Sequence, residues 1–405
     1  MLSLSKNDEY PVVFVPGIFG SVGEEIIPGS GEWQFGIAGI VYDPFICLLE
    51  ETLEFKKGVN LFIAFYDWRK KVRVSFRQYL KKTIDLAKKK NKKKKVNIIA
   101  HGMGGLLARA YIESRVYEKD VNQLILIGTP NNGTAPIFHY WTSGKKLIAQ
   151  NASLTSLLMN AYFILLSSLS ETDTIKTIHQ QFKGLHDLLP SEQYGPYLLQ
   201  KTRSAWQWIQ PIKMKKKNEF LNSLNQDDFL LKKRKVNVYL IAGFGYNTVE
   251  KLKVVATPFR SDDGKVIGTL STDFGDGYAP TSSVFSIHGE TLLLEGNHEE
   301  ILFLSLPFLA KILNRTFERK EAPSAISPSD LLFFAIKGQG ELLVGKSGFN
   351  IKVSKTLHIA LLTGTEVLQF RSHSKQKIEI FKIDTLNYEN SSLHLQKDQL
   401  ICLEC

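Results

Sequence analysis

Cysteine is scarce in this sequence: the 405 residues include three, at positions 47, 402 and 405. An odd and sparse set cannot build the disulfide framework of a small secreted domain, and it is typical of a reducing compartment. Cys402 and Cys405 are spaced as C-x-x-C, but no second pair accompanies them. The cysteines therefore predict neither a disulfide scaffold nor a metal site.

Long apolar runs are also missing. Residues 1–15 (MLSLSKNDEYPVVFV) contain no stretch long enough for a secretion signal. The apolar stretch at 154–169 is shorter than the roughly 20 residues that a membrane span needs, and it contains several Ser, Thr and Asn residues. These absences predict a cytoplasmic protein that could at most be peripheral to a membrane, and they favour an apolar cap helix at 154–169.

Acidic residues are outnumbered, 40 against 51 Lys and Arg, which gives a formal net charge of +11. Much of the excess lies in runs at 88–95, 213–217 and 232–235. The simpler interpretation is solvated helix ends, where lysines complement the helix dipole. The alternative is one patch for an anionic membrane surface, because 88–95 and 232–235 both precede predicted parallel strands. Nucleic acid is not expected as a partner, since no aromatic residues interleave the lysines.

Short apolar runs alternate with helical patterns along most of the chain. The apolar runs lie at 11–15, 61–65, 96–100, 124–127, 236–242 and 291–294. The helical patterns lie at 74–87, 106–114 and 301–313. Continuous apolar strands separated by helices indicate a mainly parallel sheet that is covered on both faces, with right-handed crossovers. The predicted fold class is therefore α/β.

This pattern is interrupted once and then stops. Residues 134–235 predict a helical cap or lid inserted into an α/β domain that spans 1–320. Residues 321–330 contain Pro, Ser and charged residues, which predicts a linker. Strand-like runs split by Gly, Ser and Lys then predict a small all-β domain over 331–405.

One motif in this last region matches a phosphate-binding loop letter for letter: residues 340–347 read GELLVGKS. Such a loop must follow a strand and open a helix whose amides hold the phosphates. Here 341–344 is itself strand-like, and Gly348 leads into another strand-like run. The segment is therefore predicted to be a hairpin turn and not a nucleotide site.

The segment 96–105 (VNIIAHGMGG) predicts a strand, a sharp turn and a helix, with small residues that let the strand and the helix approach closely. This is the context of a nucleophile elbow, but the nucleophile position is Gly102. A dinucleotide-binding loop is the competing interpretation, and it lacks a third glycine in register.

Three further segments at predicted strand ends could converge with this elbow. The turn at 15–21 (VPGIFGS) can offer backbone N–H groups to an oxyanion. Asp276 could orient a histidine, and His298 could act as general base. Each segment alone is explained as well by an ordinary turn or a surface loop. Their order in the chain, however, is that of the α/β-hydrolase triad, and it favours a catalytic site.

Together these motifs resemble the lecithin:cholesterol acyltransferase (LCAT) family and its lipase-like relatives in the α/β-hydrolase superfamily. The segments that carry the resemblance are 11–21, 66–69 (YDWR), 100–105, 128–133 (GTPNNG), 275–277 (GDG) and 296–300, with 185–224 resembling the family's cap. The resemblance covers residues 8–316 and leaves out the β domain. We expect YDWR to have a mainly structural role near the site.

The resemblance implies hydrolysis or transfer of acyl chains from lipid esters, without a metal or cofactor. It implies a nucleophile at position 102, with Asp276 as the acid and His298 as the base. Oxyanion donors would be the amides of Met103 and of Ile18 or a neighbour. Candidate substrate-binding side chains are Phe19, Leu158, Tyr162 and Leu165. The oligomeric state is not predicted.

Gly102 departs from the family pattern, because glycine has no side chain that can attack an ester. Loss of a triad nucleophile costs on the order of a million-fold in turnover. Glycine also enters the strained elbow conformation freely, so it would preserve the fold. The chain is therefore expected to be inactive, either as an inactivated hydrolase or as a natural pseudoenzyme that binds lipid or a protein. A third alternative, in which His298 activates a water molecule in the vacated space, would give slow hydrolysis at best.

Overall fold

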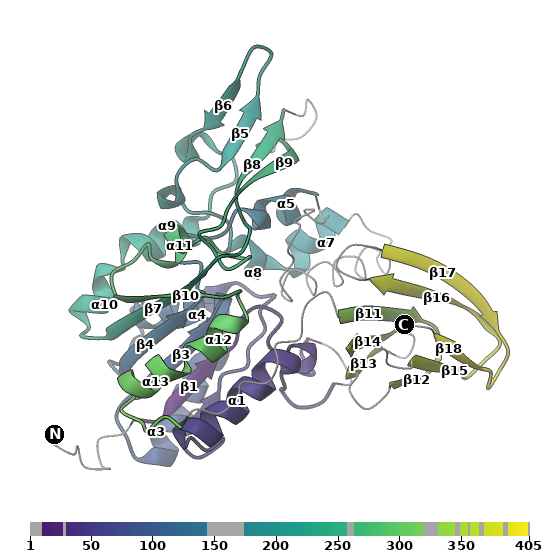
Figure 1. Ribbon diagram of the computed structural model, residues 1–405, viewed down its shortest axis with the longest axis horizontal. Coiled ribbons are helices and arrows are strands. Elements are labelled where there is room, and N and C mark those ends of the chain that lie inside the picture. Colours follow the sequence, from purple (N-terminus) through teal and green to yellow (C-terminus); the bar gives the residue numbers. More distant parts are fainter. Residues whose placement is uncertain are drawn as a thin grey trace.

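The structure is a computed structural model, shown in Figure 1, and it describes residues 10–26, 30–143, 174–256, 263–318, 331–344, 349–354, 357–363, 368–383 and 388–403. Within these residues a central sheet of parallel strands has the order β10-β7-β4-β3-β1-β2. The bounds are β1 Val12–Val15, β2 Leu61–Ile63, β3 Val96–His101, β4 Val121–Ile127, β7 Asn237–Phe244 and β10 Glu290–Glu295. Since the strands are parallel, their carboxyl ends share one edge of the sheet.

Helices cover both faces of this sheet. On one face lie α3 (Lys81–Asn91), which follows α2 (Val72–Ser75) and the π-helical turn η3 (Phe76–Leu80), and α4 (Met103–Ile112). On the other lie α1 (Gly39–Leu53), α12 (Glu300–Leu304) and α13 (Leu306–Ile312). Side chains alternate along a strand, so Val13 and Val15 pack in the core with α3 and α4, whereas Val12 and Phe14 pack with α1 and α13.

The α/β class and the mainly parallel sheet are thus confirmed. All six strands predicted for it are present, with ends shifted by a few residues. The predicted helix 301–313 is divided by Ser305 into α12 and α13. Helix α1 was not predicted, because Pro44 lies inside it and interrupts the helical pattern. Within the described residues, no helix is both long and apolar enough to cross a bilayer.

The insertion is not purely helical, contrary to the prediction. Its helices are α5 Pro136–Ser143, α7 Thr174–Gln181, α8 Lys183–His186, α9 Glu219–Gln226 and α10 Phe229–Lys233. It also has 3-10 turns at Glu192–Tyr194 and Pro211–Lys213, and a further 3-10 turn at Gly36–Ala38 lies outside the insertion, before α1. It also contains strands β5 (Leu198–Lys201) and β6 (Trp206–Ile209). Together with β8 (Thr248–Val255) and β9 (Lys265–Thr272) they form a second sheet of order β6-β5-β8-β9. Strand β5 also pairs with β8, which is distant in sequence, and a local pattern does not reveal such a partner.

Residues 144–173 lie outside the described residues, and so does the predicted cap helix at 154–169 with Leu158, Tyr162 and Leu165. The predicted linker at 321–330 also lies outside them. The predictions for these segments stay predictions.

The C-terminal region is all-β in its described parts. One sheet has the order β13-β14-β11-β16-β17 and another the order β12-β15-β18. The bounds are β11 Leu331–Lys337, β12 Gly340–Val344, β13 Phe349–Ser354, β14 Leu357–Thr363, β15 Leu368–Ser372, β16 Gln376–Ile383, β17 Tyr388–Leu395 and β18 Leu400–Leu403. The predicted hairpin at GELLVGKS is wrong, because β12 pairs with β15 and β13 with β14. A strand after the motif, where a phosphate loop requires a helix, still disfavours a nucleotide site.

Candidate functional site

Gly102 forms the turn between β3 and α4. Its backbone has φ 50° and ψ −124°, a conformation that residues with a Cβ adopt only at a cost. Its N–H donates to the Ile127 carbonyl at 3.0 Å, which fixes the turn against the neighbouring strand β4. The turn therefore places position 102 at the carboxyl edge of the sheet, facing His298.

Two more glycines of the elbow let α4 approach the sheet. A Cβ on Gly104 would lie 2.4 Å from the Pro16 carbonyl oxygen, and one on Gly105 would lie 2.0 Å from the Thr129 Oγ1 atom. Both distances are far below van der Waals contact. The small residues thus bring the start of α4 against the loops that follow β1 and β4.

Asp276 and His298 form a buried pair beside this turn. The His298 Nδ1 atom lies 2.7 Å from Asp276 Oδ2, and both side chains are almost wholly inaccessible. The other carboxylate oxygen, Oδ1, accepts from the amides of Tyr278 (2.9 Å) and Ala279 (2.7 Å). Gly128 leaves room for the imidazole, since a Cβ there would lie 2.8 Å from His298 Cε1. Asp276 therefore uses Oδ2 to hold the histidine and Oδ1 to hold its own loop.

The charge of Asp276 sets the protonation of His298. Burial alone would lower the pKa of His298, but the Asp276 carboxylate and its hydrogen bond outweigh burial and raise it. Because a carboxylate only accepts, Nδ1 carries the proton of the neutral ring, and Nε2 of that ring has a free lone pair. The Nε2 atom lies 3.1 Å from the position that a Cβ on Gly102 would occupy, and it has no partner among the described residues. A base is thus directed at the place of the missing side chain.

A second histidine, His101, supports this arrangement and was not identified from the sequence. His101 Nε2 donates to the His298 carbonyl at 2.8 Å, which fixes its tautomer because a carbonyl only accepts. The Tyr42 hydroxyl then donates to His101 Nδ1 at 2.8 Å and accepts from the Gly17 amide at 2.9 Å. Burial, with a further contribution from His298, lowers the pKa of His101 well below its usual value, so the ring is neutral. The only signal in the sequence is a histidine directly before the elbow.

Backbone donors lie on both sides of Gly102. Met103 is the first residue of α4, where helix geometry leaves the amide without an internal acceptor. Neither the Met103 nor the Ile18 amide has an acceptor among the described residues, whereas the Gly17 amide is used by Tyr42. Phe19, which was predicted to bind substrate, is buried with φ 62° and its ring centroid is 4.3 Å from that of Trp68. Its contact with substrate stays a prediction.

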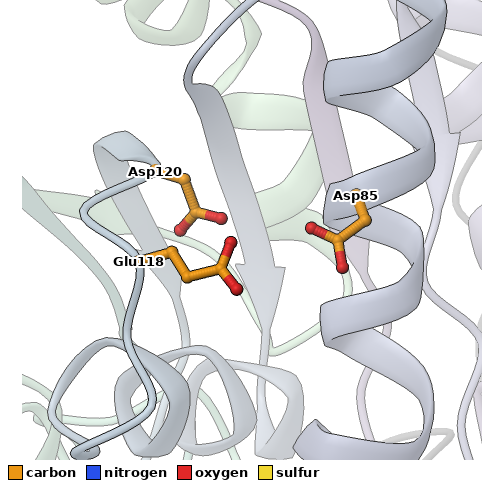
Figure 2. A group of neighbouring side chains, drawn as sticks. All are labelled: Asp85, Glu118 and Asp120. Atoms are coloured by element: carbon orange, nitrogen blue, oxygen red, sulfur yellow. The ribbon is translucent and has the colours of Figure 1, made fainter.

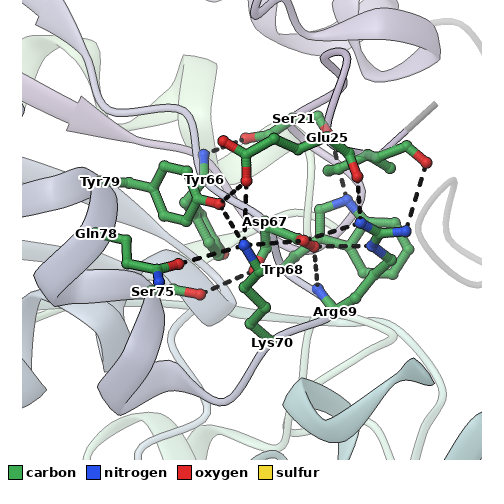
Figure 3. A network of polar contacts seen from close by, with 11 residues as sticks. Ser21, Glu25, Tyr66, Asp67, Trp68, Arg69, Lys70, Ser75, Gln78 and Tyr79 are labelled. Atoms are coloured by element: carbon green, nitrogen blue, oxygen red, sulfur yellow. Dashed lines mark hydrogen bonds and ion pairs between the residues drawn. The ribbon is translucent and has the colours of Figure 1, made fainter. Parts of the chain in front are cut away.

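The YDWR segment holds the loop after β1 in place, as Figure 3 shows. Arg69 binds Asp67 through two hydrogen bonds of 2.9 Å and reaches the Glu25 carbonyl at 2.6 Å. Trp68 Nε1 donates to the Ser21 carbonyl at 3.1 Å, and the Tyr66 amide donates to Ser21 Oγ at 3.2 Å. These bonds support the structural role expected for the segment.

A buried arginine on α4 links the elbow helix to the GTPNNG loop and to α9. Arg109 is fully buried and donates to Asn131 Oδ1 at 3.1 Å, Asn225 Oδ1 at 3.0 Å and Glu113 Oε1 at 2.9 Å. Burial raises the pKa of Glu113 to about 7, although Arg109 opposes the shift. The sequence analysis missed this network; an arginine within the apolar helix LLARAYI was its only signal.

The carboxylates of Asp85, Glu118 and Asp120 lie close enough together to suggest a metal site (Figure 2). Two lysines fill the space between them. Lys88 Nζ lies 2.6 Å from Asp120 and 3.1 Å from Asp85, and Lys81 Nζ lies 2.6 Å from Asp85 and 3.0 Å from Glu118. This group is therefore an ion-pair network at the amino edge of β3 and β4.

With a parallel sheet, a glycine elbow and an Asp–His pair at its carboxyl edge, the chain has the α/β-hydrolase fold. The family model for lecithin:cholesterol acyltransferase matches residues 37–183, so the resemblance predicted from the motifs is confirmed over that segment. The chain is similar to Phospholipase A(1) LCAT3 of Arabidopsis thaliana, with 39% identity over 82 residues (20% of this chain and 18% of the relative). It is also 36% identical over 83 residues to Lecithin-cholesterol acyltransferase-like 4 of the same plant (20% and 15%).

The chain thus spans less than a fifth of the length of the curated relatives that it matches. Among solved structures, the Tle4–Tli4 complex aligns with a TM-score of 0.49 and 14% identity, over 75% of this chain and 98% of that one.

Proposed function

We propose that this chain is a lipid acyl-ester hydrolase or acyltransferase scaffold in which Gly102 prevents covalent catalysis. One observation carries the proposal: a Cβ on Gly102 would lie 3.1 Å from His298 Nε2, while His298 Nδ1 lies 2.7 Å from Asp276. Position 102 lacks only the side chain that would make this a nucleophile–base–acid arrangement.

With a serine at position 102, the reaction would follow from these contacts. Its Oγ would attack the acyl carbonyl while His298 Nε2 takes the hydroxyl proton and Asp276 stabilises the imidazolium. The amides of Met103 and Ile18 would donate to the oxyanion. The alcohol would leave with the proton from His298, and water or a second alcohol would then accept the acyl group. With Gly102 the first bond cannot form, although an ester could still bind.

The alternative is a natural pseudoenzyme that serves as a lipid- or protein-binding module. It is favoured by the backbone of Gly102, since φ 50° is unstrained for glycine and costly for serine. Against it, a binding module has no need for a base that is held by a buried carboxylate and aimed at position 102. The two functions share one scaffold but differ in one outcome: Gly102→Ser would restore ester hydrolysis to an inactivated hydrolase and not to a pseudoenzyme.

The test is Gly102→Ser, assayed with short acyl aryl esters and with a fluorophosphonate probe. We expect a gain in ester turnover of at least about 10³-fold, since a missing nucleophile costs on the order of 10⁶. The imidazole must move by a few tenths of an ångström to admit the new Cβ, and backbone strain should lower stability by about 1–3 kcal/mol.

Gly102→Ala is the matched control, because it adds the same Cβ and strain without the oxygen. His298→Ala in the Gly102→Ser background should remove most of the gain. In the unsubstituted chain, His298→Ala also tests the water-activation alternative, which predicts loss of any slow hydrolysis. A folded Gly102→Ser protein that is inert to both the ester and the probe would refute the inactivated-hydrolase proposal and leave the pseudoenzyme.

A further inference from the structure

The second sheet has one buried face and one open face. Leu198 on β5, and Leu252 and Val254 on β8, are fully buried on the inner face. Since side chains alternate along a strand, their neighbours in sequence point to the opposite side. In Figure 1, β5 and β6 project as a hairpin away from the central sheet. The outer face therefore belongs to a protruding part of the molecule.

Two tryptophans stand on this outer face. Trp206 and Trp208 occupy alternate positions of the edge strand β6, and they are 42% and 41% exposed. In the β5–β6 register, Trp206 lies opposite Lys201 and Trp208 lies opposite Leu199. Exposed tryptophans at two successive outward positions form an apolar surface that the described residues do not cover.

Lysines surround both rings. The Nζ atoms of Lys201 and Lys253 each lie 6.0 Å from the centre of the Trp206 ring, and that of Lys251 lies 5.7 Å from the centre of Trp208. Lys251 also pairs with Glu250 at 3.2 Å. Lys201 and Lys253 make no ion pair with a described residue, and Arg203 adds a charge in the turn between β5 and β6. The face is thus positively charged as well as aromatic.

We propose that this Trp–Lys face, formed by Lys201, Trp206, Trp208, Lys251 and Lys253, docks on an anionic lipid surface. Tryptophan prefers the boundary between headgroups and acyl chains. Lysines bury their methylene stems there while the ammonium groups meet lipid phosphates and carboxylates. On this one sheet face, the aromatic rings match the acyl-chain side of the boundary and the lysine ammonium groups match its headgroup side. This surface is distinct from the candidate site and does not depend on what Gly102 does.

A single-stranded nucleic acid is the other polyanion that an aromatic and basic face could attract. It would require open ring faces on which bases can stack. Here the ammonium groups of Lys201 and Lys253 lie over the Trp206 ring, and that of Lys251 lies over Trp208. A base could stack on these rings only by displacing the lysines, whereas a lipid surface can take up the rings and the lysines together.

The basic run at 88–95 is a weaker candidate for the same partner. Its first lysine, Lys88, is held by Asp85, Glu118 and Asp120, so much of its charge is already compensated. Lys89 and Lys90 lie in the last turn of α3, where they complement the helix dipole. No exposed tryptophan accompanies them in the described residues. The basic run at 88–95 therefore lacks the exposed tryptophans that accompany the lysines of the Trp–Lys face.

The test is flotation of the full chain with phosphatidylcholine vesicles that contain or lack phosphatidylserine. The parent should bind the anionic vesicles, bind the neutral ones weakly, and lose binding as salt is raised. Trp206→Ala/Trp208→Ala, and separately Lys201→Gln/Lys253→Gln, should each weaken binding by on the order of tenfold or more. Trp206→Phe/Trp208→Phe should retain most of it.

Matched controls lie on α10, which carries the exposed aromatic Phe229 (55%) and lysines in its last turn. Phe229→Ala and Lys232→Gln/Lys233→Gln should bind as the parent does, and circular dichroism should show every variant folded. If the tryptophan pair does not fold, the lysine pair decides. Unchanged binding by the face variants would overturn the proposal. So would failure of the parent to bind anionic vesicles, or its preference for a single-stranded oligonucleotide over them.

Discussion

Two groups of titratable side chains lie at opposite edges of the central sheet, and they are built differently. At the amino edge lie Asp85, Glu118 and Asp120, which Figure 2 shows. They form ion pairs with Lys81 and Lys88. Each of these carboxylates has a cationic partner, and Tyr111 donates a further hydrogen bond of 2.7 Å to Asp120. The charges of these carboxylates are thus compensated within the group.

At the carboxyl edge, Asp276 and His298 form a pair in which one hydrogen-bonding atom is left without a partner among the residues described. Asp276 is satisfied by His298 and two amides, but His298 Nε2 has no partner in the described part of the chain. Three charges of one sign, which at first suggest a metal, thus form the closed structural group. The Asp276–His298 pair keeps one nitrogen, His298 Nε2, available to take a proton in a reaction. Whether each polar atom has a hydrogen-bond or ion-pair partner distinguishes the structural cluster from the candidate catalytic pair better than the number of charges does.

The largest effect is expected for Asp276→Asn in the Gly102→Ser background. An amide cannot stabilise the imidazolium and favours the wrong tautomer, so turnover should fall by up to about 10⁴-fold, equivalent to ~5.5 kcal/mol. The base must be neutral, so activity should rise with pH through the pKa of His298, which Asp276 raises. Removing that charge should move the acidic limb to lower pH. Aryl-ester turnover against pH measures both effects, and an unshifted limb would contradict the assigned role.

Gly105→Ala should cause the next largest effect, on stability. The new Cβ would lie 2.0 Å from Thr129 Oγ1, so α4 must move away from the loop after β4. We expect a loss of about 3 kcal/mol in the free energy of unfolding, measured in urea.

Gly268→Ala is the control for that variant. Its Cβ would meet the Lys253 side chain at an ordinary 3.6 Å, so stability should change by less than about 0.5 kcal/mol. Equal stability of the two variants would show that the elbow does not depend on close packing.

Lys88→Met should have an intermediate effect, at the other edge of the sheet. It removes three charge-assisted contacts from the group, one of them to the buried Asp120, and should cost about 2 kcal/mol near neutral pH. It should not change the ester turnover of the Gly102→Ser variant. A loss of turnover larger than the loss of folded protein would show that the two edges are coupled.

The same variant should change the acid sensitivity. Burial alone would raise the pKa of Asp85, but hydrogen bonds from Lys81 and Lys88 lower it; the same lysines lower the pKa of Glu118. A lowered carboxyl pKa stabilises the fold above the unfolded-state pKa, and this contribution is lost as pH falls through the folded-state value. Stability of the parent should therefore drop below about pH 4, and Lys88→Met should drop less steeply there.

Tyr42→Phe should give the smallest effect. The hydroxyl joins the Gly17 amide to His101, and its loss leaves both buried groups unpaired at a cost of about 1–2 kcal/mol. In the Gly102→Ser background it should also lower turnover by several-fold, because the loop after β1 and the His298 loop lose their connection. Tyr246→Phe, which removes a half-buried hydroxyl bound to Glu300, is the control and should cost less. Equal costs in urea unfolding would remove the special role given to Tyr42.

Much of the candidate site could be predicted because its members follow strands. The apolar runs before Gly102 and His298 identified β3 and β10, and parallel strands bring their carboxyl ends to one edge whatever the rest of the chain does. The supporting contacts could not be predicted. His101, Tyr42 and Arg109 act through partners distant in the chain, and neither spacing nor periodicity records which partner a buried polar side chain finds.

The sequence by itself determined the α/β class, the order of the central strands' loops and the glycine at position 102, because alternation of apolar runs and turn residues is a local property. Tertiary structure alone decided three further matters. It made the acidic cluster at Asp85 an ion-pair network, and it placed β12, which contains GELLV, and β13 in different sheets. It also brought Trp206 beside Lys253, from strands that are not consecutive, onto one open face. Each of these depends on which distant segments pair, and that is set by the packing of the whole chain.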